Sequence, residues 1–244
     1  MNSTNGWEDP YYPGQERTTE VAQQEEQSDA PQQTDLYEAY WERQRKIILS
    51  AGVTLSLVAA NLIVYLVEIF GKQTFYEGFA LDTSVVAAGA EQYRLLTAMF
   101  MHASIPHLVS NMVILLLIGA AVEGELGHLP YAVIYLVSGL IGNMLTVWWD
   151  VMLGDPTWSV GASGAVFGII GAVAVIFIRE RKQLRGRRGL ALRLGLMVFY
   201  SLFSGFGQTE INNAAHVGGF LAGTMFSTLY TLLARKRYHL DSWL

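Results

Sequence analysis

The stretch GASGAVFGIIG, residues 161–171, places a serine at the start of an apolar segment that continues to Ile178. Five further apolar segments occupy residues 47–70, 105–122, 129–149, 190–204 and 213–234. The longer ones can cross about 30 Å of hydrocarbon, and the fourth and fifth are short enough to be packed inside a bundle. A soluble all-helical core is the alternative, but so many apolar runs in one chain argue against it. The sequence predicts an all-α, polytopic membrane protein with a bundle of six transmembrane helices.

The N-terminal region differs in composition from the rest of the chain. The protein has 244 residues and a net charge of −5, and residues 1–42 carry 10 of its 21 acidic side chains. This region lacks apolar periodicity, so we expect a disordered, polar and acidic cytoplasmic tail at 1–42. The membrane domain is then expected at 43–238, with a short C-terminal end at 239–244. No basic n-region opens the chain and the first apolar run starts only near Ile47, so the run 47–70 is expected to be an uncleaved first helix rather than a signal peptide.

Composition also excludes several kinds of chemistry. The chain has no cysteine, which removes disulfides, zinc–thiolate sites and a cysteine nucleophile. It has no H-E-x-x-H motif, and no basic aromatic surface of the kind that binds nucleic acid. We therefore expect no metal, no cofactor and no nucleic-acid partner, whereas the oligomeric state is left open.

The distribution of Lys and Arg predicts the orientation in the membrane. Basic residues gather before the first segment at 43–46, after the fourth at 179–193 and after the sixth at 235–237. The other side carries only Lys72 and Arg94. By the positive-inside rule both termini are cytoplasmic in a multi-pass protein of the cell membrane. The second, fourth and sixth helices then enter from outside, and the aromatic connection 71–94 is expected to lie in the outer interface.

Ser163 lies at the start of the fourth segment, where a helix has free N–H groups and the positive end of its dipole. Taken alone, such a serine is more often a helix cap or a small packing residue. The spacings Gly164-x-x-x-Gly168 and Gly219-x-x-x-Gly223 let transmembrane backbones approach closely. Close approach of these two helices would bring Ser163 Oγ within hydrogen-bond reach of His216, as a Ser–His dyad requires.

The second segment supplies further polar groups near its start. His107 and Asn111 are four residues apart, hence on one face of a helix, and both can donate hydrogen bonds to an oxyanion. Polar side chains that only bond neighbouring helices are the alternative, but ionisable residues inside a membrane are costly and favour a functional site. Asp150 and Asp155 fall in one expected loop, which argues against a carboxylate dyad. We see no acidic residue placed to orient His216, so we expect a dyad and not a triad.

Five motifs follow one another along the chain: Tyr93-Arg94, His102 with His107 and Asn111, Glu123-x-x-Leu126-Gly127, Gly161-x-Ser163-Gly164, and Ala215-His216-x-x-Gly219-x-x-x-Gly223. Together, over roughly residues 45–235, they resemble the rhomboid family of intramembrane serine proteases. The chain departs from the family in Tyr93, where Trp is usual. It lacks a seventh helix, as in the six-helix bacterial form.

The resemblance implies a role for each matching residue. Ser163 would be the nucleophile of a serine endopeptidase and His216 its general base. The oxyanion would be stabilised by the Ser163 N–H and by side chains or backbone at His107, Asn111 and Gly161. Supporting positions would be Phe167, which packs on the catalytic histidine, together with Gly164, Gly219 and His102.

The family also implies the partners and suggests alternatives. Substrates would be transmembrane segments of single-pass proteins in the lipid bilayer. We expect them to enter past a gate formed by the fifth helix and the last outer loop, with Phe203 and Phe206. A catalytically silent rhomboid-like protein that binds transmembrane segments is the alternative function. A transporter or channel is less well supported, because we find no inverted repeat.

Overall fold

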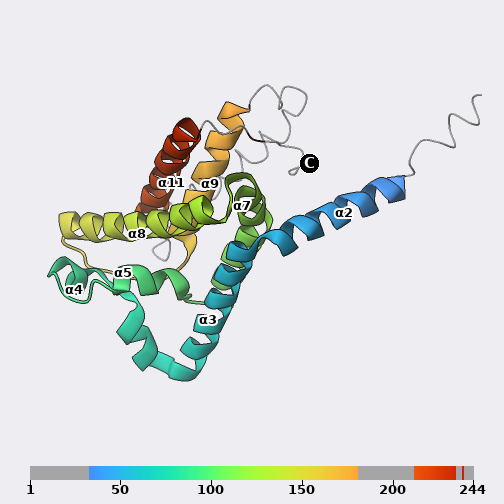
Figure 1. Ribbon diagram of the computed structural model, residues 1–244. Helices are drawn as coiled ribbons and strands as arrows, with labels where there is room; N and C mark the ends of the chain where they lie inside the picture. Colours follow the sequence, from blue (N-terminus) through green and yellow to red (C-terminus); the bar gives the residue numbers. More distant parts are fainter. Residues whose placement is uncertain (1–32, 181–211, 235–237, 239–244) are drawn as a thin grey trace, which may run out of the picture. The chain divides into compact units, whose positions relative to one another are not determined.

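The computed structural model describes residues 33–180, 212–234 and 238, which are mostly helical (Figure 1). The chain divides into two units, Met1–Arg43 and Gln44–Leu244. The helix α2 (Gln33–Ser50) begins in the first unit. Tyr37 and Trp41, one helical turn apart, have ring centroids separated by 5.9 Å, a pairing that favours helix. The region 1–42, for which the sequence predicts disorder, is therefore helical from Gln33 onward; its first 32 residues lie outside the described chain.

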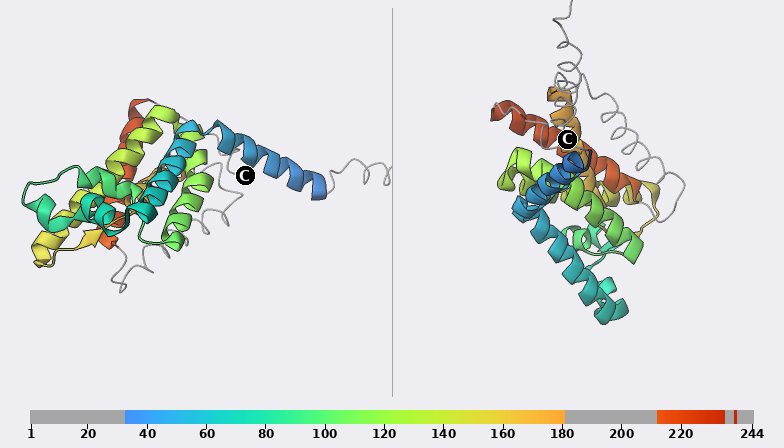
Figure 2. Two further views of the ribbon diagram at one scale, coloured as in Figure 1. Left: turned by 90° about the horizontal axis from the view of Figure 1, so that it is seen from below. Right: turned by 90° about the vertical axis from the view of Figure 1, so that its right-hand side faces the viewer.

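The second unit is a helical bundle with one small β-ribbon (Figure 2). A π-helical turn, η2, joins α6 to α7, so that residues 105–126 form one continuous helix. The strands β1 and β2 pair antiparallel, with Leu81 opposite Ser159. In chain order the elements are α3 (Gly52–Phe79), β1 (Leu81–Asp82), α4 (Thr83–Ala87), α5 (Arg94–Thr97), η1 (Ala98–Phe100), α6 (Ile105–Ile114), η2 (Leu115–Gly119), α7 (Ala120–Leu126), α8 (His128–Leu153), β2 (Trp158–Ser159), α9 (Ser163–Arg179) and α11 (Asn213–Leu233).

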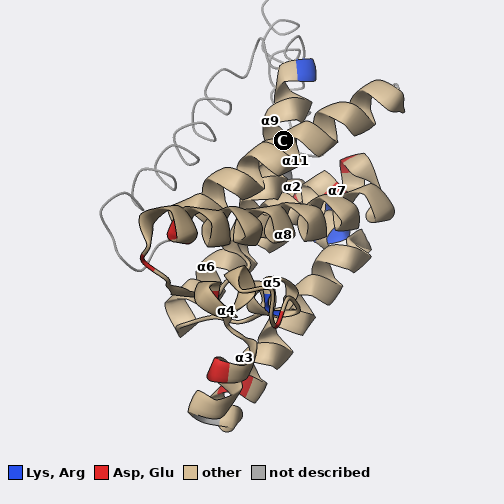
Figure 3. Cartoon of the chain, turned by 90° about the vertical axis from the view of Figure 1, so that its left-hand side faces the viewer, with Lys and Arg blue, Asp and Glu red and all other residues tan. Residues whose placement is uncertain are grey.

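Three helical stretches of the described chain are long and apolar enough to cross a membrane: Gly52–Gly71, Ile105–Leu126 and His128–Leu153. They coincide with the first three predicted segments. The fourth predicted segment corresponds to α9, which is apolar but shorter, with 17 residues. The sixth corresponds to α11, whose glycines, hydroxylated residues and His216 lower the mean hydropathy of that helix. The predicted fifth segment, 190–204, lies outside the described residues. Charged side chains are sparse along the bundle, and α9 carries a basic residue, Arg179, in its last turn (Figure 3).

The contact between α9 and α11 depends on glycine. A Cβ atom at Gly219 would overlap the carbonyl group of Gly164, and one at Gly223 would overlap the carbonyl group of Gly168. The two helices therefore meet backbone to backbone, as the two Gly-x-x-x-Gly spacings predict. This contact sets the separation of the two helices that carry Ser163 and His216.

The helix α8 packs against both α9 and α11 in the same way. A Cβ atom at Gly142 would lie 2.7 Å from the carbonyl oxygen of Ala215, and one at Gly168 would overlap the side chain of Ser138. Small residues thus allow close approach between all three pairs of α8, α9 and α11; Figure 1 shows α9 beside α11, with α8 crossing both. The residue before His216 is therefore fixed by direct backbone contact with α8.

The N-terminus of α3 is capped by a residue that is distant in sequence. The Glu123 carboxylate, 1% exposed, accepts hydrogen bonds from the backbone N–H groups of Val53 and Thr54, at 2.9 and 2.7 Å. No side chain next to the helix start caps it. Glu123 also pairs with the imidazole of His128, which lies at the start of α8. One carboxylate thus connects the beginnings of α3 and α8 to the end of α7.

We expect Glu123→Ala to destabilise the bundle by about 3 kcal/mol, because it leaves two N–H groups of α3 without acceptors. The measurement is the unfolding midpoint of the purified protein in mixed micelles. The matched control is Glu77→Ala, which removes an exposed carboxylate whose hydrogen-bond partner is Gln73 on the same helix. It should change the free energy of unfolding by less than about 0.5 kcal/mol. Equal midpoints for the two variants would contradict this role of Glu123.

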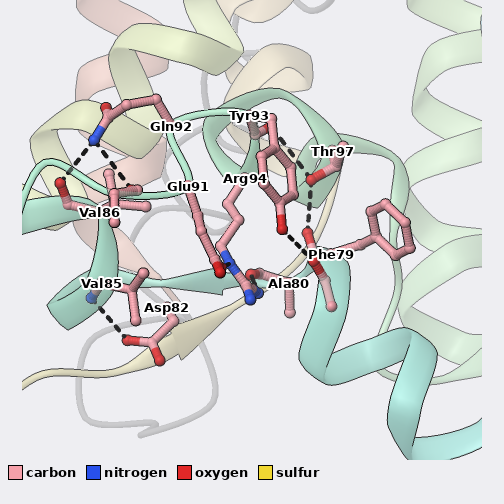
Figure 4. Close-up of polar contacts among 12 residues, drawn as sticks. Phe79, Ala80, Asp82, Val85, Val86, Glu91, Gln92, Tyr93, Arg94 and Thr97 are labelled. Atoms are coloured by element: carbon pink, nitrogen blue, oxygen red, sulfur yellow. Dashed lines mark hydrogen bonds and ion pairs between the residues drawn. The ribbon is translucent and has the colours of Figure 1, made fainter.

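The connection between α3 and α6 folds back on the C-terminal end of α3 (Figure 4). Arg94, 6% exposed, donates to the Ala80 carbonyl at 2.6 Å and forms an ion pair with Glu91. The Tyr93 hydroxyl donates to the Gly78 carbonyl at 3.0 Å, and Thr97 donates to the Phe79 carbonyl at 2.7 Å. Side chains of this connection thereby satisfy the last carbonyl groups of α3, which no helical N–H can reach.

A buried carboxylate at the end of α8 holds this connection to the segment before α9. Asp150 accepts hydrogen bonds from the hydroxyl of Thr83 at 2.8 Å and from the hydroxyl and N–H of Thr157 at 2.6 and 3.1 Å. All three hydrogen bonds are to one carboxylate oxygen, Oδ2, which joins α4, α8 and the residue before β2. The sequence predicts that Asp150 lies in a loop, whereas the structure places it in the last turn of α8, which ends at Leu153.

Candidate active site

Ser163 is the first residue of α9 and is half-buried. Among the described residues its backbone N–H donates to no acceptor, as is normal for the first turn of a helix. The side chain and this N–H therefore lie together at the positive end of the helix dipole. An anion that forms next to the serine oxygen would be stabilised there.

His216 lies in the first turn of α11 and is 7% exposed. Its Nε2 atom is 2.9 Å from Ser163 Oγ, so the two side chains share a hydrogen bond. The Phe167 ring stacks on the imidazole with a centroid distance of 4.2 Å and an interplanar angle of 21°. Within the described residues Nδ1 has no hydrogen-bond partner, and no carboxylate reaches it. The arrangement is a Ser–His pair whose imidazole is oriented by an aromatic ring.

His107 lies against the backbone of Gly161, two residues before Ser163. Gly161 has a φ of +136°, and a Cβ atom there would lie 2.7 Å from Cε1 and 2.9 Å from Nε2 of His107. Only glycine therefore fits both the conformation and the space. The Gly161 N–H donates to the Ala98 carbonyl at 2.9 Å. Its contribution to the site is thus the space that it leaves for His107, because its amide is already engaged.

Asn111 follows His107 by one turn of α6 and is 4% exposed. Its amide nitrogen donates to the His107 carbonyl at 3.0 Å. Within the described part of the chain it makes no hydrogen bond to Ser163 or His216. A second N–H of the amide is left for another acceptor. The two predicted residues of α6 are therefore one helical turn apart, and His107 is in direct contact with Gly161 in the segment that leads to Ser163.

His102 lies behind His107 and is 1% exposed. The two rings meet edge to face with centroids 5.0 Å apart. The backbone N–H of His102 donates to the Glu68 carboxylate of α3 at 3.3 Å. Burial, followed by the proximity of His107, lowers the pKa of the His102 imidazole to about 4, so that the ring is neutral at physiological pH. A neutral ring at this position supports His107 without adding a charge next to it.

Sequence reasoning did not assign a role to Asn212, although an asparagine before an apolar helix is a usual N-cap signal. Its side chain accepts the backbone N–H of Ala215 at 2.9 Å. The same side chain contacts Ser159 and Thr146, which no local pattern predicts.

In the described ranges, no group of three His, Asp or Glu side chains is arranged to hold a metal ion.

The chain is similar to proteins of one family. Residues 89–233 match the Rhomboid domain. The chain is 35% identical over 159 residues to RHOMBOID-like protein 5 of Arabidopsis thaliana, covering 65% of this chain and 50% of that protein. It is 33% identical over 166 residues to the rhomboid protease GluP of Bacillus subtilis, covering 66% and 31%. It is 36% identical over 144 residues to Rhomboid-like protease 3 of Toxoplasma gondii, covering 57% and 51%.

These alignments span about half or less of the relatives' own lengths. Some of the relatives are named proteases and others only rhomboid-like proteins. The matched region contains η1, the continuous helix 105–126, α8, α9 and α11, and therefore every residue of the site described above. Because the Rhomboid domain covers more than half of its length, the chain belongs to the rhomboid family.

Proposed function

We propose that the protein is an intramembrane serine endopeptidase that cleaves transmembrane segments with a Ser163–His216 dyad. The observation that carries this proposal is the 2.9 Å hydrogen bond between Ser163 Oγ and His216 Nε2 at the N-terminus of α9. A serine is a weak nucleophile unless a neighbouring base removes its proton, and the imidazole is within the distance that this transfer requires. The protease name of some relatives, GluP among them, adds support.

The first half of the reaction forms an acyl-enzyme. Ser163 Oγ attacks the carbonyl carbon of the scissile peptide while its proton passes to His216 Nε2. The tetrahedral intermediate collapses, the peptide C–N bond breaks, and His216 returns the proton to the leaving amine. Phe167 keeps the ring in the plane from which Nε2 reaches both the serine and the leaving nitrogen.

The second half releases the acyl group by hydrolysis. Water takes the place of the amine, His216 accepts its proton, and the hydroxide attacks the ester carbonyl. Collapse of the second tetrahedral intermediate breaks the bond to Ser163 Oγ, which takes the proton back from His216, and the product leaves as a carboxylic acid that then loses its own proton to water. In this proposal water reaches the site from the outer side of the membrane, and Ser163 and His107 are each only half-buried.

The oxyanion of both intermediates would be stabilised by the Ser163 N–H, the His107 imidazole and the second N–H of Asn111. Donors of this kind are effective because they are already oriented and need no rearrangement during the reaction. In this proposal Gly161 contributes by admitting His107, and Gly164 and Gly219 contribute by holding α9 and α11 together.

Asn111→Ala is expected to lower kcat by about 10²–10³-fold, the usual effect of losing one oxyanion donor. The measurement is the steady-state cleavage of a model single-pass substrate in proteoliposomes. KM should change little, because the donor acts mainly on the developing charge. Ser56→Ala, which removes an exposed hydroxyl that donates to the Gly52 carbonyl within α3, serves as the control. Unchanged kcat in Asn111→Ala would remove this residue from the oxyanion site.

We further propose that both termini are cytoplasmic and that the site lies in the outer half of the cell membrane. The charge distribution of the sequence supports this orientation. A helical substrate satisfies its own backbone groups, so it must unwind before Ser163 can reach a carbonyl. The proposed gate, with Phe203 and Phe206, lies outside the described residues.

The test is cleavage of a single-pass substrate by the purified wild type and by Ser163→Ala in proteoliposomes. Cleavage by the wild type alone supports the endopeptidase. Binding of the substrate helix without cleavage by either protein would favour the catalytically silent alternative and overturn the proposal.

A further inference from the structure

We propose that Asn212 is a positioning residue that fixes Ser163 and His216 relative to each other by joining the approaches to their two helices. This inference rests on the proposed function, because it concerns the geometry of the same dyad. Asn212 touches neither reacting atom, and its effect is transmitted through the segments that carry them.

The Asn212 side chain forms hydrogen bonds to three different elements, through both the nitrogen and the oxygen of its amide. Its nitrogen donates to Ser159 Oγ in β2 at 2.8 Å. Its oxygen accepts the hydroxyl of Thr146 in α8 at 3.0 Å and the N–H of Ala215 in α11 at 2.9 Å. A planar amide with fixed donor and acceptor ends permits this combination only when the three elements hold one arrangement.

On the His216 side, Asn212 defines the first turn of α11. Its side chain caps Ala215, and its backbone carbonyl accepts the His216 N–H at 3.2 Å. Thr146 then ties this turn to α8, four residues along from Gly142, whose backbone meets the Ala215 carbonyl. The start of the helix that carries His216 is therefore held to α8 both by a hydrogen bond and by backbone packing.

On the Ser163 side, Asn212 holds the strand that leads into α9. Ser159 precedes the nucleophile by four residues, and β1 pairs with one edge of this strand. The Gly161 N–H also donates to the Ala98 carbonyl. The β1–β2 pairing and this hydrogen bond together hold the segment before α9 to the connection between α3 and α6. The hydrogen bond from Asn212 to Ser159 is the side-chain contact, among the described residues, that holds the segment to the start of α11. It completes a short path of fixed groups from Ser163 to His216.

An ordinary helix cap would explain the contact with Ala215 but not those with Ser159 and Thr146. The substitution Asn212→Ser separates the two roles. Serine caps a helix about as well as asparagine. Its side chain has a hydroxyl in place of the carboxamide, so it is shorter and has no amide N–H donor. The variant therefore retains the cap and loses the connection to β2. Ser159→Ala removes the same connection from its other end.

The experiment compares wild type, Asn212→Ser, Ser159→Ala and the double variant in proteoliposomes with a model single-pass substrate. We expect each single variant to lower kcat by about 10- to 100-fold, as displacement of a reacting group does, with KM within about twofold. The double variant should be no worse than the more impaired single variant, because both remove one hydrogen bond. The unfolding midpoints should stay near that of the wild type.

The matched control is Thr228→Val, which removes an exposed hydroxyl that donates to the Thr224 carbonyl further along α11. It should leave kcat, KM and the unfolding midpoint unchanged. If Asn212→Ser and Ser159→Ala also cleave at the wild-type rate, Asn212 is a helix cap only and the inference is overturned. Independent, multiplicative losses in the double variant would overturn it as well.

A readout that needs no turnover separates this inference from the proposed function. The nitrogen-15 signals of the His216 imidazole report its hydrogen bond to Ser163, and comparison with His216→Ala assigns them. A changed His216 signal in Asn212→Ser supports the positioning role even if the wild type cleaves nothing, a result that would count against the endopeptidase alone. An unchanged signal would overturn the positioning role whatever the protein cleaves.

Discussion

Ser163→Ala and His216→Ala are each expected to abolish cleavage of a single-pass substrate while leaving the fold intact. Removing Ser163 Oγ removes the atom that attacks the carbonyl, and removing the imidazole leaves the serine without a base 2.9 Å away. Members of such a unit typically contribute about 10⁶-fold to kcat, and removing both costs little more than removing one. The double variant should therefore be as inactive as either single variant.

The measurement is product formation over several hours, compared with a control that loses an unrelated hydroxyl. Ser56→Ala serves for this, because its exposed hydroxyl donates only to the Gly52 carbonyl within α3. Both Ser163→Ala and the control should keep the wild-type unfolding midpoint, since the half-buried Ser163 packs no large group. Cleavage by Ser163→Ala at a rate comparable to the wild type would exclude Ser163 as the nucleophile.

The second large effect is expected for Gly219→Ala. A methyl group at Gly219 would overlap the backbone carbonyl of Gly164, and neither backbone can rotate away as a flexible side chain can. The variant must separate α9 from α11, which we expect to cost about 3 kcal/mol of stability or more. Because these helices carry Ser163 and His216, kcat should also fall by at least about 100-fold.

Gly124→Ala is the matched control for this prediction. Gly124 lies in α7 and is exposed, and no atom beyond its chain neighbours and the backbone of its own helix lies within 4 Å of the Cβ position. The substitution should leave activity unchanged and stabilise the helix by up to about 1 kcal/mol. If Gly219→Ala retained wild-type stability and kcat, the glycine contact would not determine the geometry of the dyad.

Much of the bundle could be predicted because its signals are local. Apolar length locates the first three spans, and glycine repeats at a spacing of four predict the close contact of α9 with α11. The spacing of His107 and Asn111 places them on one face of α6, as the structure has it. The order of these motifs was sufficient to recognise the rhomboid family.

The contacts that the sequence did not predict join residues far apart in the chain. Glu123 caps α3 across 70 residues, and Asn212 reaches Ser159 across 53. Neither contact has a periodic signature in the sequence, because a single polar side chain is enough to form it. The continuation of α3 to Phe79, beyond the predicted end at Phe70, has the same origin: side chains of the following connection satisfy its last carbonyl groups. Gly161 shows a further limit, since only the backbone reveals that its N–H is engaged by Ala98.

The most direct test of the proposed mechanism is to locate a covalent label on the protein itself. The purified wild type, Ser163→Ala and His216→Ala would be incubated with a fluorophosphonate and digested for peptide mass spectrometry. We predict a single adduct on Ser163 in the wild type and none in either variant, because the serine is nucleophilic only beside His216. A wild type that stays unlabelled while folded, or equal labelling of Ser163 in His216→Ala, would contradict the dyad.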